Sequence, residues 1–324
     1  MKKPFLLVAS GFVFFLLITL GGGLWYLVNQ PNYTESKKAR LVIARGESPA
    51  LIAKKLYNQG LVYHPLVFQL AVRATGTASK LKAGSFTIEG RLSPAAIAQR
   101  LTKRPEDTWI KLLEGWRREE MADYLATQEL TAFDRQEFLS LTKDKEGYLF
   151  PDTYLVPKEI TTEALVNLLL NTFDKKVKQG LANELSQSER SLNQLIIIAS
   201  LLEREARGYD QMRHVAGIIY NRLKLGMLLQ LDATLQYLRG WDGKAQSYWS
   251  PPSVALKKSA SPYNTYFYLG LPPTPIANPG LSAIKAALNP LETDDLYYLH
   301  APDGKIYYAK TLEKHNQNIK RYLQ

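Results

Sequence analysis

Glu203 and Glu205 lie at the end of a long apolar stretch, residues 195–202, which contains neither proline nor glycine. Such a stretch is typical of a helix that is buried on most sides. Burial disfavours an ionised carboxylate and therefore raises its pKa, as a general acid near neutral pH requires. A salt bridge to Arg204 or Arg207 is the structural alternative, and these residues alone do not decide between the two.

Other kinds of catalytic site find less support in the sequence. The four histidines are not spaced as metal ligands, and a site built from Glu203, Glu205 and His214 is the weaker reading. No serine has the sequence of a nucleophile elbow, and no glycine-rich phosphate loop follows a predicted strand. We therefore expect neither a metal nor a cofactor. Of the catalytic mechanisms considered, acid–base catalysis by a carboxyl group is the one that the sequence supports.

Polar residues alternate with apolar ones over residues 227–234, which predicts a strand. Gln230, Asp232 and Thr234 would then share one face of that strand. Short polar side chains of this kind suit a surface that faces a ligand. For Asp232, pairing with Arg222 is the equal alternative.

Two rigid loops rich in aromatic residues, 146–154 and 261–266, could complete a cleft around the acid. Aromatic rings in such loops suit stacking on a sugar, although they suit packing in a core equally well. A single acid among tyrosine, amide and hydroxyl side chains is typical of sites that cleave carbohydrates. The candidate binding residues in these loops are Tyr148, Asp152, Tyr263, Asn264 and Tyr266.

The elements that must position these residues are mainly helices, which predicts a mixed α+β fold. The spacing of apolar residues predicts helices over 118–127, within 129–145, and over 162–179, 192–205, 215–225, 282–288 and 312–322. Short strands are predicted over 109–113, 297–300 and 306–309.

The segment before residue 106 resembles a LysM module, a fold that binds glycans containing N-acetylglucosamine. The sequence predicts a strand over 40–44, capped helices that begin at Ser48 and His64, and a returning strand over 82–88. This order and the stretch ARGESPALIAKKLYNQGLV carry the resemblance. A spacer without affinity for glycans is the alternative. We expect a linker at 29–38, a LysM-like βααβ subdomain at 39–105 and a catalytic domain at 106–324.

The first residues predict a membrane anchor. Phe5 to Val28 carries no charged side chain and is long enough to span a bilayer as a helix. Lys2 and Lys3 precede it, so the positive-inside rule places the N-terminus in the cytoplasm and the remaining chain outside it. A cleaved signal peptide is the alternative. We therefore expect residues 1–28 to form a cytoplasmic stub and transmembrane helix of an inner-membrane protein.

The charge and the absence of cysteine restrict the partners and the compartment. The formal net charge of +11 favours an anionic neighbour, such as a phospholipid surface, an acidic wall polymer or nucleic acid. The charges are scattered and no nucleic-acid-binding motif is present, so we expect no nucleic acid. A chain without cysteine has no disulfide framework, which is compatible with an extracytoplasmic location.

Four blocks of the sequence resemble the endolytic murein transglycosylases, the MltG or YceG-like family. They are IIIASLLEREA, VAGIIYNRLKLGMLLQLDATLQY, SPYNTYFYLGLPPTPIANPG and EGYLFPDTY. The resemblance extends from about Lys38 to the C-terminus. It implies a membrane-anchored enzyme in which a LysM-like subdomain precedes a catalytic domain that cuts nascent peptidoglycan strands internally.

The resemblance also implies the reaction. Lytic transglycosylases cleave the β-1,4 bond between N-acetylmuramic acid and N-acetylglucosamine without water. One carboxyl group protonates the leaving oxygen and then accepts the proton of the muramyl C6 hydroxyl, which closes a 1,6-anhydro ring. By the motif, Gln230, Asp232 and Thr234 should line the groove together with the loop at 263–266.

We expect Glu203 to be the acid and Glu205 to be a supporting carboxylate. The two lie about 200° apart on a helix, so they cannot share a face. Ala199, Ser200 and Ala206 surround Glu203 and would leave room for a sugar, whereas bulkier residues surround Glu205. The family motif also places the catalytic glutamate on the first of the pair.

Two alternatives to this function remain open. A hydrolytic muramidase would use the same glutamate with water as the nucleophile. A non-catalytic scaffold would hold glycan strands through the LysM-like part and recruit peptidoglycan synthases.

Overall fold

The structure is a computed structural model that describes residues 15, 18–19, 21–31, 37–44 and 46–323. It is a mixed α+β fold with two-stranded sheets, as predicted. The chain divides into two compact units, one formed by Met1–Ile110 with Tyr154–Lys158 and the other by Lys111–Thr153 with Glu159–Gln324.

The predicted transmembrane span lies mostly outside the described residues. Residues 1–14, 16–17 and 20 are not described, nor is the middle of the predicted linker at 32–36. Among the residues that are described, none belongs to a helix with the length and apolar character needed to cross a bilayer. The membrane anchor therefore stays a prediction.

The first unit contains the predicted strand–helix–helix–strand order. Strands β1 (Lys37–Ile43) and β2 (Gly84–Gly90) pair antiparallel, with Leu41 opposite Phe86. The elements packed with them are α2 (Pro49–Asn58), α3 (Pro65–Ala74), η1 (Ala78–Lys80) and α4 (Pro94–Arg100). Apolar side chains from both strands and three helices form one core, including Leu41, Leu56, Phe68, Phe86 and Ile97.

Side-chain caps begin the helices of this unit as predicted. Ser48 Oγ accepts from the backbone N–H of Leu51, and the His64 imidazole accepts from Leu66 at the start of α3. A proline follows each cap at the first helical position, where its missing N–H leaves no hydrogen bond unmade. This capping hydrogen bond accounts for a histidine at position 64 without a catalytic or binding role.

A short two-stranded sheet and two helices follow along the chain. Strand β3 (Asp107–Lys111) pairs with β4 (Thr153–Pro157). Helix α5 (Arg118–Ala126) matches its prediction, whereas the stretch 129–145 contains only the short helix α6 (Arg135–Leu141).

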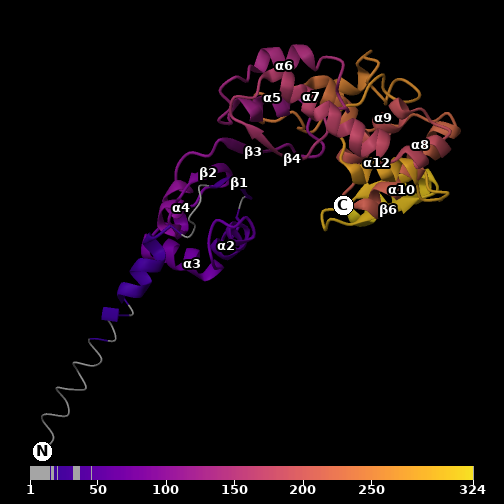
Figure 1. Ribbon diagram of the computed structural model, residues 1–324. Helices are drawn as coiled ribbons and strands as arrows, with labels where there is room; N and C mark the ends of the chain where they lie inside the picture. The colour runs from indigo at the N-terminus through magenta and orange to yellow at the C-terminus, as the bar shows by residue number, and fades with distance from the viewer. Residues whose placement is uncertain (1–14, 16–17, 20, 32–36, 45, 324) are drawn as a thin grey trace, which may run out of the picture. The chain divides into compact units, whose positions relative to one another are not determined.

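Helix α9 (Leu192–Glu205) lies at the centre of the second unit. All eight residues from Leu195 to Leu202 are buried, as the apolar stretch predicted. Helices α10 (Tyr209–Lys224) and α12 (Leu281–Leu288) pack directly against α9 (Figure 1). Before them come α7 (Thr162–Phe173), which continues as the π-helix η2 (Asp174–Gln179), and α8 (Ala182–Gln187).

The predicted strand over residues 227–234 is wrong. An irregular segment follows α10, and helix α11 (Asp232–Arg239) then begins within the supposed strand. Gln230 adopts a left-handed backbone conformation with φ 51°, and its N–H donates to the carbonyl of Thr265 rather than to a strand. Asp232 opens a helix, where a negative side chain is favoured by the helix dipole. Gln230, Asp232 and Thr234 therefore do not share a strand face.

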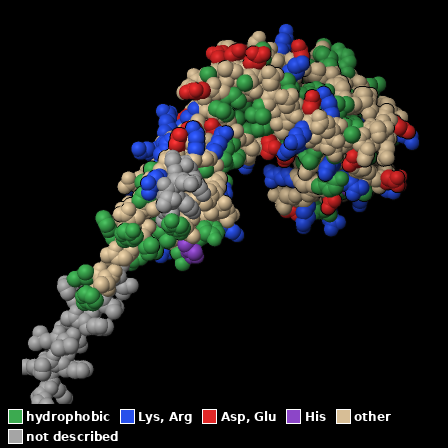
Figure 2. Space-filling model, in the orientation of Figure 1, with side chains coloured by type: hydrophobic (Ala, Val, Ile, Leu, Met, Phe, Trp, Pro, Cys, Tyr) green, Lys and Arg blue, Asp and Glu red, His purple; other side chains and the backbone are tan. Residues whose placement is uncertain are grey.

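The C-terminal elements match their predictions. Strands β5 (Tyr297–His300) and β6 (Ile306–Ala309) form an antiparallel hairpin, and helix α13 (Leu312–Tyr322) packs against it. The 3-10 helix η3 (Val254–Lys258) lies within the long segment between α11 and α12. On the face shown in Figure 2, Lys and Arg side chains are interspersed with acidic ones over the surface of the second unit.

Candidate active site

The end of α9 presents three charged side chains in three directions. Glu203, Arg204 and Glu205 are successive residues of the last turn, so each points about 100° from the next around the helix axis. No ion pair within 4 Å joins either glutamate to Arg204 or Arg207 among the described residues. The simple salt bridge that the sequence left open is therefore not formed.

Glu205 lines a cavity of about 320 Å³. Three predicted site residues, Gln230, Asp232 and Tyr266, line the same cavity, so the structure brings them together with Glu205. The remaining lining residues come from α10, from the segment before α11 and from the C-terminal hairpin and helix. They are Arg222, Leu229, Leu231, Tyr297, Tyr298, Leu312 and His315.

Each carboxylate of this cavity accepts a hydrogen bond from a tyrosine. Tyr298 Oη donates to Glu205 Oε2 at 2.8 Å, and Tyr266 Oη donates to Asp232 Oδ1 at 2.7 Å. Burial raises the pKa of Glu205; the hydrogen bond from Tyr298 opposes that shift, and the charge of Asp232 adds to it. Glu205 is thus a partly desolvated acid with one oxygen held in place.

Arg222 holds the cavity wall together. It is only 8% exposed, and its Nε donates to the carbonyl of Leu296 while its Nη1 donates to the carbonyl of Leu229. The guanidinium thereby links α10 to Leu296, the residue just before β5, and to the loop before α11. Asp232 does not form the alternative ion pair with Arg222 in the described structure, since its carboxylate is bonded to Tyr266.

Glu203 lies against the polypeptide on a different side of α9. The backbone N–H of Gly280 donates to Glu203 Oε1 at 2.9 Å. Gly280 leaves no room for a side chain, because a Cβ there would collide with the Glu114 carboxylate. Burial raises the pKa of Glu203 to about 7; the hydrogen bond from Gly280 opposes this shift and the charge of Glu114 adds to it.

The small residues before Glu203 are buried within the protein. Ala199 and Ser200 are fully buried, and Ser200 Oγ accepts from the backbone N–H of Ile276 at 3.1 Å. The segment 276–280 therefore packs against this part of α9, while Glu203 itself stays half-buried.

Arg204 stacks on Trp249, with the guanidinium carbon 3.9 Å from the ring centroid. The indole N–H of Trp249 donates to Glu120, whose other contact is the backbone N–H of Arg117. Burial lowers the pKa of Arg204, while the charges of Glu120 and Glu203 oppose that shift. On the Arg204 side, the end of α9 is therefore covered by Trp249, which is hydrogen-bonded to Glu120.

Two of the remaining predicted site residues are buried supports rather than cavity residues. Thr234 and Asn264 are both 0% exposed. The Thr234 hydroxyl donates to the carbonyl of Leu231, and the Asn264 amide donates to three carbonyls of residues 256–259. These two residues fix the loops that carry the cavity residues, because their polar groups are already bonded within the protein.

The structure places the other predicted residues outside the cavity. Tyr263 shares a hydrogen bond with Thr274 at 2.6 Å. Tyr148 donates to Asn193 and packs on Phe173, and Asp152 pairs with Lys176.

Glu146, a weaker candidate for the site from the sequence, forms a buried centre with Asn278, which the sequence did not single out. Asn278 Oδ1 accepts from the backbone N–H groups of Gly147 and Leu149, and its Nδ2 donates to Glu146 at 2.7 Å. Burial raises the pKa of Glu146 to about 8. These hydrogen bonds join the loop around Glu146 to the segment 276–280, whose last residue, Gly280, contacts Glu203.

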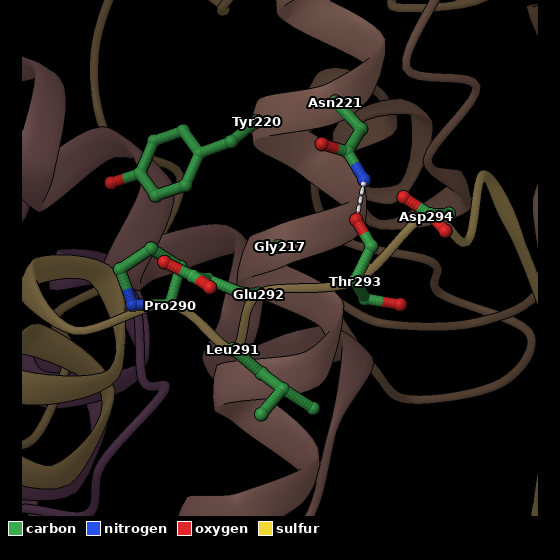
Figure 3. Close-up of a pocket in the computed structure, with 8 residues that line it drawn as sticks. All are labelled: Gly217, Tyr220, Asn221, Pro290, Leu291, Glu292, Thr293 and Asp294. Carbon is green, nitrogen blue, oxygen red and sulfur yellow. Dashed lines mark hydrogen bonds between the residues drawn. The ribbon is translucent and has the colours of Figure 1, made fainter.

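A second hollow, of about 440 Å³, lies between α10 and the segment after α12 (Figure 3). Asn221 donates across it to the carbonyl of Thr293 at 2.7 Å, and Glu292 and Asp294 lie on its rim. None of the predicted site residues lines this hollow. Among the described residues, no group of three or more His, Asp or Glu side chains could hold a metal ion.

Comparison with known proteins finds relatives that are named endolytic murein transglycosylases. It is 30% identical to a protein of Bacillus subtilis named endolytic murein transglycosylase, over 94% of this chain and 91% of that protein. It is 29% identical to a protein of the same name from Streptococcus pneumoniae over 98% of this chain, which spans 65% of that relative's length.

The crystal structure of a YceG-like protein from Listeria monocytogenes matches with a TM-score of 0.54 and 27% identity. The match covers 87% of this chain and 99% of that protein. Residues 41–321 match the profile of the YceG-like family, a range that includes both structural units and the cavity at Glu205. The chain therefore belongs to the YceG-like family.

Proposed function

We propose that this chain is an endolytic peptidoglycan lytic transglycosylase that uses one glutamate as general acid and base. The observation that carries the proposal is the end of α9, where carboxyl groups with a raised pKa lie beside a cavity lined by tyrosine, glutamine and aspartate side chains. Family membership and the names of the relatives support the reaction class.

We assign the acid to Glu203 and a supporting role to Glu205, as the family motif implies. Burial raises the pKa of Glu203 to about 7, which suits a general acid near neutral pH. The backbone N–H of Gly280 holds one oxygen of this half-buried carboxyl group. Glu205, which lines the cavity, is the alternative, and the experiments below separate the two.

One carboxyl group can perform both steps of the reaction. Protonated Glu203 donates its proton to the glycosidic oxygen as the bond to the muramyl C1 breaks. The resulting carboxylate then accepts the proton of the C6 hydroxyl as its oxygen bonds to C1, so the same group is regenerated as an acid. Asp232, which lines the cavity at the same end of α9, adds electrostatic stabilisation of the positive charge that develops on the sugar.

The presence of two carboxyl groups in one cavity also favours a second candidate, a hydrolytic muramidase. Glycosidases that use water need a second carboxylate, and Asp232 could fill that role. The hydrolytic product would carry a reducing end in place of the anhydro ring.

The remaining parts of the proposal concern location and partners. Phe5–Val28 would anchor the protein in the inner membrane with its N-terminus in the cytoplasm and both folded units outside. The LysM-like first unit would bind glycan or set the distance from the bilayer. Nascent peptidoglycan strands are the proposed substrate and peptidoglycan synthases the proposed partners. A non-catalytic scaffold is the alternative from another class.

Product mass tests the proposed function. The full-length protein, purified in detergent, is incubated with uncrosslinked glycan strands, and the products are analysed by mass spectrometry. We expect 1,6-anhydro ends that appear internally along the strands. Reducing ends heavier by one water would support the muramidase, and no cleavage would support the scaffold.

A further inference from the structure

The positive charge of the chain is concentrated in its first folded unit. Residues 37–110 contain 13 Lys and Arg against 4 Asp and Glu, a formal net charge of +9. Residues 111–324 contain 26 Lys and Arg against 25 Asp and Glu, a formal net charge of +1. Most of the +11 of the whole chain therefore belongs to the first unit, so an anionic partner should meet the protein there.

Helix α3 of this unit has an exposed side that carries two leucines and a basic residue. Leu66 and Leu70 are 58% and 36% exposed, and Arg73 is exposed as well. Positions 66, 70 and 73 are neighbours on one side of the helix, opposite to the buried Phe68 and Val72. Among the described residues, none forms an ion pair or a hydrogen bond with the Arg73 guanidinium. Leu66, Leu70 and Arg73 are called the α3 face below.

The N-terminal helix meets the first unit beside α3. Residues 21–29 are helical, and Val28 in their last turn is buried because it packs with Ala71 of α3 and Ala95 of α4 (Figure 1). Trp25, three positions earlier, is exposed, as an aromatic residue at a membrane interface would be. The predicted membrane span ends at Val28, so this contact brings α3 next to the surface of the bilayer.

We propose that the α3 face is a lipid-binding surface, which holds the first unit against a bilayer of anionic phospholipid. Leu66 and Leu70 enter the boundary between head groups and acyl chains, and the Arg73 guanidinium meets the lipid phosphates. The net charge of +9 on this unit adds a longer-range attraction to the same surface. This inference rests on the membrane anchor in the proposed function and deepens it.

Two features favour lipid over the other anionic partners. An acidic wall polymer would satisfy the positive charge, but it offers exposed leucines little apolar surface to pack against, whereas a bilayer offers both phosphates and an apolar interior. The anchor also makes the contact intramolecular. Lipid is then present at a high effective concentration beside α3, so two leucines and one arginine suffice where a free domain would need a larger surface.

The test measures contact between lipid and single labelled positions in the full-length protein. The chain contains no cysteine, so Leu70→Cys gives one attachment point for a fluorophore. The protein is placed in nanodiscs of phosphatidylglycerol and phosphatidylcholine, with or without bromine on the acyl chains as a quencher. Leu225→Cys is the matched control, because this leucine is exposed on the second unit. Phe15→Cys reports on the predicted anchor.

We expect brominated lipid to remove about half of the fluorescence at position 70, since an interfacial helix buries its apolar side about 5–10 Å deep. Position 15 should be quenched more strongly, because it lies within the predicted span, and position 225 should not be quenched. Arg73→Glu should weaken the quenching at position 70 severalfold, and so should nanodiscs of phosphatidylcholine alone, because each change removes attraction between the α3 face and anionic lipid.

An unquenched label at position 70 would overturn the inference, whatever position 15 shows, and Leu66→Cys on the same face replaces Leu70→Cys if that variant does not fold. Quenching at position 225 as strong as at position 70 would also overturn it, because the contact would then not be specific to the α3 face. A label at position 70 that responds to hexa-N-acetylglucosamine and not to lipid would assign the face to a glycan instead. An unquenched position 15 would refute the anchor alone, and position 70 still decides the inference.

Discussion

The two sides of the end of α9 carry the same functional group in opposite surroundings. On one side, Glu205 faces a cavity of about 320 Å³ with Asp232 and two bonded tyrosines. On the other, Glu203 accepts from Gly280 and is half-buried, with the charge of Glu114 nearby. Both carboxyl groups have a raised pKa from burial.

This contrast shows that a perturbed pKa does not by itself identify a catalytic acid. Burial raises the pKa of structural carboxyl groups as well, and Glu146 is a third example in the same unit. The two carboxyl groups differ in their partners: a backbone N–H for Glu203, and a tyrosine hydroxyl beside a cavity for Glu205. The comparison is therefore between a Glu203 side and a Glu205 side of the helix end.

Replacing each glutamate in turn should give the largest difference between the two sides. Glu203→Gln should lower the rate of anhydro-end release about a thousandfold, because glutamine cannot transfer the proton. Glu205→Gln keeps an oxygen that can accept from Tyr298 and should retain part of the activity. Full loss in Glu205→Gln with activity kept in Glu203→Gln would reverse the assignment.

The Glu203 side should be sensitive to the loss of Asn278. Asn278→Ala leaves the buried N–H groups of Gly147 and Leu149 without their partner and removes one of the hydrogen bonds to Glu146. We expect the free energy of unfolding to fall by about 2–4 kcal/mol, as measured by urea denaturation. The exposed Asn289→Ala is the control and should cost much less. Equal effects of the two variants would argue against a buried structural centre at Glu146 and Asn278.

The Glu205 side should respond to the charge of Asp232. That charge raises the pKa of Glu205, so Asp232→Asn should lower that pKa and reduce the rate of anhydro-end release about tenfold. The pKa is measured in protein labelled with carboxyl-¹³C glutamate, where the Glu205 signal is identified by its loss in Glu205→Gln. An unshifted titration in Asp232→Asn would contradict the described electrostatics.

The smallest expected effect concerns the dependence of stability on pH. In the folded protein the pKa of Glu203 is about 7, against an ordinary value of 4.5, so between these values the native state holds a proton that the unfolded chain has released. Its contribution therefore makes stability fall as pH rises through this window. Glu203→Gln should reduce the fall seen in denaturation midpoints from pH 4.5 to 7, and the exposed Glu159→Gln should not.

Helix α9 and the C-terminal hairpin could be predicted because their signals are local. A continuous apolar stretch capped by Ser191 defines the helix, and two short aromatic strands define the hairpin. The prediction failed over residues 227–234, where alternation of polar and apolar residues is compatible with a loop followed by a helix start. Contacts with Thr265, distant in sequence, decide the backbone there.

The candidate site was only partly accessible from the sequence. The helical period correctly separated Glu203 from Glu205, and Gln230, Asp232 and Tyr266 do line the cavity. The sequence could not show that the segment 276–280 packs along the Glu203 side of α9, because its contacts with Ser200 and Glu203 join residues 76 and 77 positions apart. Tyr298 and Arg222 carry no local signal, because their roles depend on contacts over 70 or more positions.

The most direct test of the account is a crystal structure of Glu203→Gln with a bound glycan fragment. The account predicts that the oxygen of the scissile bond lies within hydrogen-bond distance of the substituted side chain, next to Gly280. A glycan whose scissile oxygen lies against Glu205 instead, with no contact to residue 203, would contradict it.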